Sequence, residues 1–179
     1  FFQKQLWESN SGQKALAYLQ KRGLKEETIK DYKLGFSPDS WESLSDFLKT
    51  RSFRDQEIFD AGLSVRREKG SGYYDRFRSR IMFPVADSNG QTVGFTGRVF
   101  GKEDDSAKYI NTPQTLTYDK SRLLYGLDKA KMQIRSQDRC ILMEGNMDVI
   151  LSHQAGVLNA VATSGTALTD QHLKTIRRY

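Results

Sequence analysis

The spacing of apolar positions is helical over the first sixty residues of the chain. Apolar side chains recur every three or four positions there, and glycines follow three of the four segments that show this period. A turn with Asp39 and Ser40, two residues that cap helices well, precedes the third segment. We therefore predict four short helices, at residues 13–22, 25–33, 41–49 and 54–61.

The period then changes to strict alternation. Phe77, Ile81, Phe83 and Val85 alternate with arginines, which predicts a strand over residues 76–85. Residues 87–90 (Asp-Ser-Asn-Gly) are typical of a hairpin turn, and residues 93–99 alternate again. If the apolar faces of the two strands pair, one face of the hairpin carries four arginines: Arg76, Arg78, Arg80 and Arg98. A looser polar stretch, residues 101–117, follows.

The last third of the chain alternates between strand and helix patterns. We predict helices at 126–136, 147–154 and 170–178, the last capped by Thr169, and strands at 139–143 and 158–163. This order favours parallel strands joined by helical crossovers. The expected fold class is α+β, with a basic mixed α/β amino-terminal subdomain at 1–120 and an α/β parallel-sheet subdomain at 121–179.

The strand at 139–143 ends at a carboxylate. Glu144 falls at the strand tip, where open α/β sheets place their active sites. Gly145 would allow a sharp turn, Asn146 would cap the next helix, and Asp148 falls in its first turn. An ordinary strand–turn–helix with a solvated acid has the same pattern.

A second strand exit, residues 162–169, is rich in hydroxyls and glycine. Its backbone amides could hold an anion next to Glu144 across a parallel sheet. A plain loop between a strand and a helix has a similar composition, so this interpretation depends on the neighbouring segments.

The formal net charge of +6 favours polyanionic partners. Basic residues concentrate between positions 66 and 80, together with two glycines and the pair Tyr73–Tyr74. Arginines bind phosphates and aromatic rings stack on unpaired bases, so this segment is a candidate single-strand nucleic-acid surface. The alternative is an alternating strand with a solvated charged face.

Several classes of site and location are disfavoured. Cys140 is the only cysteine and falls in a predicted buried strand, so no disulfide framework or zinc site is expected. His153 and His172 have no partner at ligand spacing, and we interpret both as structural. No apolar run reaches the roughly 20 residues that cross a bilayer. We expect a reduced, cytoplasmic protein without a membrane partner, and the first residue, Phe1, indicates a piece of a longer chain.

Six segments together resemble the catalytic core of bacterial replicative DNA primases. They occur in the family's order and span most of the chain: 75–84 (DRFRSRIMFP), 94–99 (GFTGRV), 108–113 (KYINTP), 124–127 (LYGL), 144–149 (EGNMDV) and 162–166 (ATSGT). The sequence departs from the family at Asn146, where many members have an aromatic residue, and by two extra residues between Gly101 and Lys108.

The resemblance implies a basic amino-terminal subdomain followed by the first part of a Toprim fold. It implies a DNA-templated RNA polymerase that makes short primers and uses Mg²⁺ or Mn²⁺. Glu144 corresponds to the catalytic and metal-binding glutamate, with Asp148 as a supporting acid. The family's basic binding residues fall on Arg22, Arg98, Lys108 and Lys120, with further basic positions at Arg76 and Arg78.

The resemblance also concerns parts that this sequence lacks. The family's remaining acidic ligands lie on an Asp-x-Asp strand that would follow Tyr179, so we expect these 179 residues to be inactive alone. Expected partners are single-stranded DNA, ribonucleoside triphosphates and, through a domain absent here, the replicative helicase at the bacterial replication fork. Zinc belongs to another absent domain, and a monomer is expected. The alternatives are a nucleic-acid-binding Toprim fragment of a topoisomerase or nuclease, and a binding module without chemistry.

Overall fold

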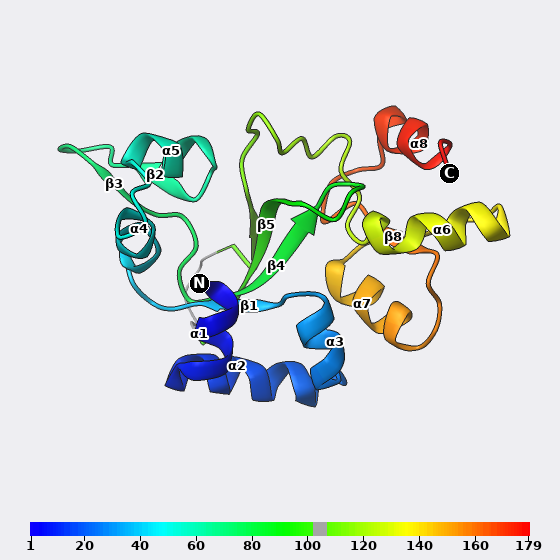
Figure 1. Ribbon diagram of the computed structural model, residues 1–179, viewed down its shortest axis with the longest axis horizontal. Coiled ribbons are helices and arrows are strands. Elements are labelled where there is room, and N and C mark those ends of the chain that lie inside the picture. Colours follow the sequence, from blue (N-terminus) through cyan, green and yellow to red (C-terminus); the bar gives the residue numbers. More distant parts are fainter. Residues whose placement is uncertain (102–106) are drawn as a thin grey trace.

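An antiparallel sheet forms the centre of the computed structural model, which describes residues 1–101 and 107–179 (Figure 1). Its four strands lie in the order β1 (Gly35–Ser37), β4 (Arg80–Ala86), β5 (Thr92–Val99) and β6 (Tyr109–Asn111). The turn between β4 and β5 closes as expected, because Asp87 accepts hydrogen bonds from the backbone of Asn89 and Gln91. Three helices pack beside this sheet: α1 (Phe2–Glu8), α2 (Asn10–Lys21) and α3 (Glu26–Asp31).

A small lobe projects from one end of the molecule (Figure 1). It contains α4 (Ser43–Lys49), α5 (Asp55–Asp60) and a hairpin of β2 (Ser64–Arg66) and β3 (Tyr73–Asp75). The buried Asp75 carboxylate ties the hairpin to α4, since it accepts hydrogen bonds from the backbone N–H groups of Leu44 and Ser45 and from the Ser45 hydroxyl. It thereby satisfies donors that the amino-terminal turn of a helix leaves unpaired.

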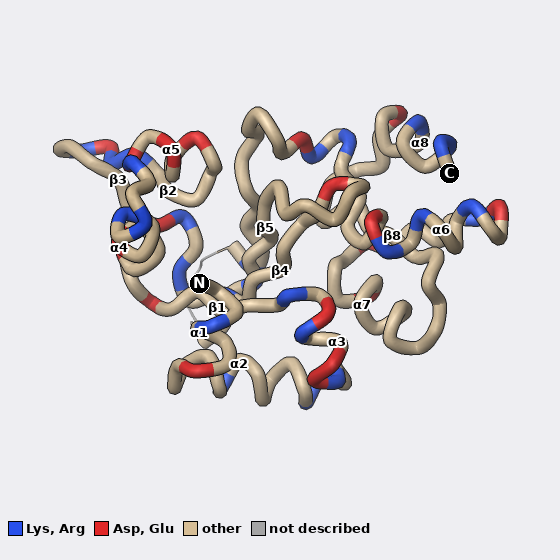
Figure 2. Tube along the Cα trace, viewed as in Figure 1, with Lys and Arg blue, Asp and Glu red and all other residues tan. Residues whose placement is uncertain are grey.

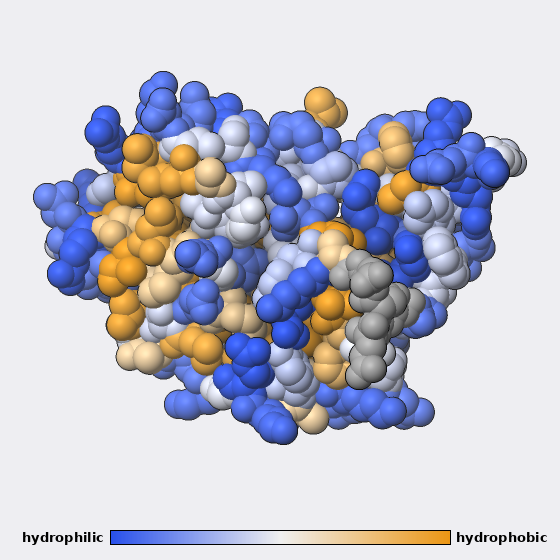
Figure 3. Space-filling model, turned by 180° about the vertical axis from the view of Figure 1, so that it is seen from behind, coloured by the Kyte–Doolittle hydropathy of each residue, from blue (hydrophilic) through white to orange (hydrophobic). Residues whose placement is uncertain are grey.

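The carboxyl-terminal elements form the other end of the molecule. They are α6 (Leu127–Gln137), β7 (Ile141–Met143), α7 (Asn146–Gln154), β8 (Ala160–Ala162) and α8 (Asp170–Ile176). β7 and β8 pair in parallel, which confirms the expected α/β arrangement. Figure 3 shows apolar side chains gathered over this end of the molecule. Its exposed large apolar residues are Met132, Leu142, Val157, Leu158, Leu168 and Leu173.

Both faces of the central sheet are buried. On one face, Ile81 and Phe83 pack in the core with α2 and α7. On the other face, Met82 packs with Phe2 and Phe77. The amino-terminal helices and the carboxyl-terminal elements therefore share one core on the Ile81 and Phe83 face of the sheet. Among the described residues, no helix is long and apolar enough to cross a membrane.

The predicted face with four arginines is wrong. Ile81 lies opposite Arg98 and Arg80 lies opposite Val99, and residues that oppose each other in a ladder point to the same face. Arg80 and Arg98 therefore point to opposite faces. Arg76 and Arg78 precede β4, which begins only at Arg80. The prediction failed because it assumed one apolar and one solvated face, whereas this sheet is covered on both sides.

Arg80 lies within the fold. It is 6% exposed, and its Nη1 donates to the carbonyl oxygens of Gly97 and Ala107 at 3.2 and 3.0 Å. The polar stretch predicted at 101–117 contains β6, and residues 102–106 of that stretch lie outside the described residues.

Candidate active site

The acidic strand tip forms as predicted, but its cap differs. Glu144 follows β7 directly and is exposed, and Asp148 lies in the first turn of α7. Gly145, not Asn146, is the helix N-cap, and its N–H donates to Asp148 Oδ2 at 3.2 Å. Gly145 has an extended backbone (φ −123°), so no left-handed turn is present. A Cβ at this position would lie 2.9 Å from Asp148 Oδ2. Glycine therefore matters here because it admits the carboxylate.

Asn146 connects the two strand exits. It is buried at the start of α7, and its Oδ1 accepts a hydrogen bond of 2.7 Å from the hydroxyl of Ser164, which follows β8. Its Nδ2 has no partner among the described residues. Ser164 and Gly165 line the same cavity as Glu144, so the loop that we expected beside the acid does lie there.

This cavity lies between the central sheet and the strand tips. Its volume is about 480 Å³, and Lys120, Glu144 and Asp148 are among its lining residues. A neighbouring cavity of about 120 Å³ is lined by three more cations, Arg22, Arg98 and Lys108. Tyr109, Gly145 and Asp148 line both cavities, so we treat the two as one cleft.

Tyr18 organises the two arginines of the cleft. Arg22 Nη1 donates to the Tyr18 hydroxyl at 2.9 Å, and the Arg98 guanidinium lies 5.0 Å from the centre of the same ring. A cation over an aromatic face is held in place without losing its charge. In the described parts of the chain, none of Arg22, Arg98, Lys108 and Lys120 forms an ion pair. Their charges are therefore available to an anion.

Arg76 and Arg78 do not line this cleft and belong to the lobe that carries α4. The Arg78 guanidinium lies 4.0 Å from the centre of the Trp41 ring and 5.1 Å from that of Tyr74. Trp41 is 56% exposed, so these groups form a stacked cationic and aromatic platform on the surface. Arg76 is half-buried, and burial lowers the pKa of its guanidinium.

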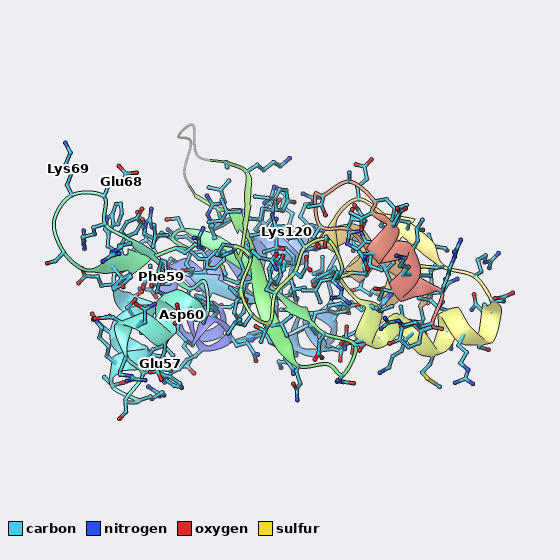
Figure 4. The ribbon with its side chains drawn as sticks, turned by 90° about the horizontal axis from the view of Figure 1, so that it is seen from above. Glu57, Phe59, Asp60, Glu68, Lys69 and Lys120 are labelled. Atoms are coloured by element: carbon cyan, nitrogen blue, oxygen red, sulfur yellow. The ribbon has the colours of Figure 1, made fainter. Side chains whose placement is uncertain are left out.

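Trp41 was not among the residues predicted to be functional. The adjacent Tyr73–Tyr74 pair and Arg78 were the available signals, but nothing local showed that Trp41 contacts them. Figure 4 shows Glu68 and Lys69 at the tip of the same lobe, far from Lys120 in the cleft. Figure 2 shows Lys and Arg distributed over the whole chain, so net charge alone does not locate either surface.

The ring nitrogens of both histidines contact other groups of the protein. His153 Nε2 donates to the Ala160 carbonyl at 2.8 Å, and its Nδ1 contacts the Tyr32 hydroxyl. His172 Nε2 donates to the Lys120 carbonyl at 2.9 Å, while its Nδ1 accepts from the Thr169 N–H. Burial lowers the pKa of His153. Because both nitrogens of each ring are used, the structural interpretation of these residues agrees with the geometry.

The cleft carries donors that suit a hard divalent cation. Glu144 and Asp148 supply carboxylate oxygens, which Mg²⁺ and Mn²⁺ prefer, with water and phosphate oxygens completing the coordination. The described residues contain no group of three or more candidate metal ligands. Two carboxylates can supply part of the ligands of one metal ion but are too few for a two-metal site.

Comparison with known proteins places this cleft in a family context. Residues 1–131 match the family model described as the amino-terminal domain of the DNA primase catalytic core, and residues 141–179 match a Toprim-like model. A DNA primase of Staphylococcus aureus is 44% identical over 178 residues, and one of Deinococcus radiodurans is 44% identical over 164 residues. The alignments cover 99% and 92% of this chain but only 29% and 28% of those relatives.

Solved structures agree with the sequence matches. The RNA polymerase domain of Mycobacterium tuberculosis primase DnaG aligns with a TM-score of 0.93 and 37% identity, covering 99% of this chain and 57% of that one. A DnaG primase catalytic domain bound to single-stranded DNA aligns with a TM-score of 0.85 and 38% identity, covering 99% of this chain and 54% of that one. These structures share 37% and 38% sequence identity with this chain, so the match reflects sequence relationship as well as a common fold.

Proposed function

The chain belongs to the DNA primase catalytic core family, and we propose that it is part of a DNA-templated RNA polymerase that makes short RNA primers on single-stranded DNA. We further propose that residues 1–120 form the template-binding subdomain and residues 121–179 the first part of a Toprim domain. The observation that supports this function best is the cleft. It brings four cations from separate segments, none of which forms an ion pair within the described residues, to the side of two carboxylates at a strand tip.

Primer synthesis needs both kinds of group. The 3′-hydroxyl of one nucleotide attacks the α-phosphate of the next, and pyrophosphate leaves with added negative charge. Arg22, Arg98, Lys108 and Lys120 would bind and orient the phosphates, which favours the charge of the leaving group. Glu144 and Asp148 would hold Mg²⁺ or Mn²⁺, which when bound activates the hydroxyl and neutralises phosphate charge. The remaining acidic ligands would come from outside these 179 residues.

The Trp41–Arg78 platform gives the template a second contact. Exposed aromatic rings stack on unpaired bases, and Arg78 adds a cation for the phosphates between them. We propose that single-stranded DNA binds both this platform and the basic cleft. The complex of a related catalytic domain with single-stranded DNA supports this proposal for the family.

The remaining partners follow from the family relationship. We propose ribonucleoside triphosphates as substrates, a replicative helicase as a partner through a separate domain, and a monomer acting at the replication fork in the bacterial cytoplasm. Zinc would belong to a separate domain, as in an Aquifex aeolicus primase structure that contains zinc-binding and RNA polymerase domains.

Replacing Glu144 with glutamine in the full-length protein that carries this chain tests the proposed chemistry. The change keeps shape and removes charge, so primer synthesis should fall by at least two orders of magnitude, about 2.7 kcal/mol in barrier height. Single-strand affinity should be unchanged, because the cations lie on other segments. Asp148→Asn should do less damage, because Asp148 accepts a hydrogen bond from the N–H of the N-cap Gly145, and an asparagine oxygen can keep that bond.

A matched control is Glu68→Gln, because Glu68 is an exposed glutamate at the tip of the lobe, far from the cleft (Figure 4). It should leave primer synthesis unchanged. Near-normal turnover of Glu144→Gln at saturating Mg²⁺ would remove Glu144 from the chemistry.

A further inference from the structure

Helix α7 joins the acidic side of the cleft to the segment that carries Arg22. Asp148 lies in its first turn and lines the cleft, and its last residue, Gln154, lies at the opposite end. Six residues separate the two, which is roughly 9 Å along a helix axis. Figure 1 shows α7 beside α3, at the turn where α2 ends and α3 begins.

Gln154 makes two hydrogen bonds to this turn. Its Nε2 donates to the carbonyl oxygen of Gly23 at 2.8 Å, and its Oε1 accepts from the backbone N–H of Lys25 at 2.8 Å. The partners lie 131 and 129 positions away in the sequence, so these bonds join two distant parts of the fold. The Gln154 amide therefore binds the two residues that flank Leu24: its donor binds Gly23 and its acceptor binds Lys25.

The turn needs such a partner. Lys25 is the N-cap of α3 and has no side-chain cap, so its N–H would otherwise lack an acceptor. Gly23 has a left-handed backbone (φ +94°) that ends α2 and turns its carbonyl away from the helix. A primary amide supplies donors and an acceptor in one plane, so a single side chain can bind both groups.

The turn carries a cleft residue. Arg22 is the C-cap of α2, directly before Gly23, and its guanidinium bonds to Tyr18 in the cleft. Two other polar links hold the end of α3 and not the turn: Lys129 of α6 pairs with Asp31 at 2.8 Å, and His153 of α7 contacts Tyr32. Among the described residues, the side-chain hydrogen bonds from α7 to the backbone of the α2–α3 turn are therefore those of Gln154.

We propose that Gln154 is a positioning residue that sets the place of Arg22 relative to the acidic end of α7. This inference rests on the proposed function, because it assumes that Arg22 binds phosphate. Loss of the Gln154 amide should leave the fold in place, since Leu24 and Ile29 stay buried in the core beneath the turn. It should release the backbone of the turn and so weaken what the Arg22 guanidinium contributes to binding.

A double-mutant cycle on this chain tests the proposal. The affinity for fluorescein-labelled oligothymidylate is measured for the wild type, Arg22→Ala, Gln154→Leu and the double variant. In the wild-type background, Arg22→Ala should weaken binding roughly 10-fold, as expected for a hydrogen bond to a charged group. In the Gln154→Leu background the same change should cost less than about threefold.

The matched control is Gln137→Leu. Gln137 also lies at the end of a helix and is exposed, but within the described residues its side chain bonds to Gln133 of its own helix alone. In that background, Arg22→Ala should cost as much as in the wild type. Amide hydrogen exchange at Lys25 should quicken in Gln154→Leu and stay unchanged in Gln137→Leu, which reports the hydrogen bond independently of binding.

Each outcome decides the matter. An Arg22→Ala cost that is equal in the wild-type and Gln154→Leu backgrounds would overturn the positioning role, because a merely structural residue lowers stability without coupling to Arg22. If Arg22→Ala has no effect even in the wild type, the proposed phosphate contact of Arg22 fails and the positioning role fails with it. Should Gln154→Leu not fold, Gln154→Glu takes its place in the cycle, since it keeps the acceptor for Lys25 and loses the donor to Gly23.

Discussion

The double variant Arg98→Ala/Lys108→Ala removes half of the positive charge that lines the cleft. Arg98 extends from β5 against Tyr18, and Lys108 directly precedes β6 on the same side of the cleft. In the described parts of the chain, neither is neutralised by an ion pair. If both contact phosphates, the variant should bind single-stranded DNA more weakly and with a smaller dependence on salt.

The expected magnitude follows from counterion release. Each phosphate contact to a single strand adds about 0.7 to the slope of log affinity against log salt, so four cleft cations give about 2.8 and two give about 1.4. Raising salt from about 50 to 200 mM should therefore weaken the wild type roughly 50-fold and the variant only roughly 7-fold. Contacts made by the Trp41–Arg78 platform add equally to both proteins and leave the difference unchanged.

Fluorescence anisotropy with labelled oligothymidylate across this salt range measures both quantities. The variant loses the contact between Arg98 and Tyr18, which should cost about 0.5–1 kcal/mol of stability and lower Tm by about 1–4 °C. Lys14→Ala/Arg135→Ala is the matched control, since it also lowers the net charge from +6 to +4 at exposed positions outside the cleft.

The salt slope separates a specific contact from general attraction. The control variant should keep the wild-type slope, because its two side chains touch no phosphate. If the cleft variant kept the wild-type slope and affinity, the placement of single-stranded DNA in this cleft would be wrong. If both variants lost the same slope, the binding would reflect net charge and not the cleft.

Three further outcomes are expected. Arg80→Met should lower the free energy of unfolding by about 1–3 kcal/mol in urea titrations, because it removes the hydrogen bonds of the buried Arg80 guanidinium to Gly97 and Ala107. The salt slope of DNA binding should not change, and a reduced slope would show that Arg80 contacts the DNA. Burial lowers the pKa of His153 below its value of 6.5 in the unfolded chain. The unfolded state therefore binds more protons, and the stability of the fold should decrease as pH drops below about 6.5. In thermal melts between about pH 7 and 5, His153→Gln should show a smaller decrease. The 179-residue chain should bind template without making primers in a magnesium-dependent assay, and primer synthesis by this chain alone would contradict the argument from too few carboxylates.

Local pattern was enough to predict the acidic strand tip and the helices from α2 to α8, whereas α1 was not assigned a range. Apolar spacing and end signals lie within a few residues of each element, so α2, α5 and α6 appear close to their predicted bounds. Glu144 was found for the same reason, since a strand that ends in a carboxylate and a glycine is visible in one short segment. The parallel pairing of β7 and β8 followed from the order of the elements.

The sequence could not show how the central sheet is covered. An alternation of arginine and apolar residues usually marks one solvated face, but here α1 and the lobe with α4 pack against the second face through Phe2 and Leu44. Arg80 is therefore buried although it lies in phase with charged neighbours. Strands of three residues, such as β1 and β6, are too short to show alternation and exist because β4 and β5 offer them free edges.

Asn146 shows how a departure from the family pattern can fit the site. The resemblance seen in the sequence implied an aromatic residue at this position, and asparagine gives the first turn of α7 a smaller, polar side chain. The structure gives the smaller side chain a polar role, because its Oδ1 holds the Ser164 hydroxyl and so fixes the loop after β8 beside Glu144. Asn146 also lines this cavity, and its Nδ2 has no partner among the described residues. Val149 and Ile150, in the next turn of α7, are fully buried and anchor the helix independently of its first residue.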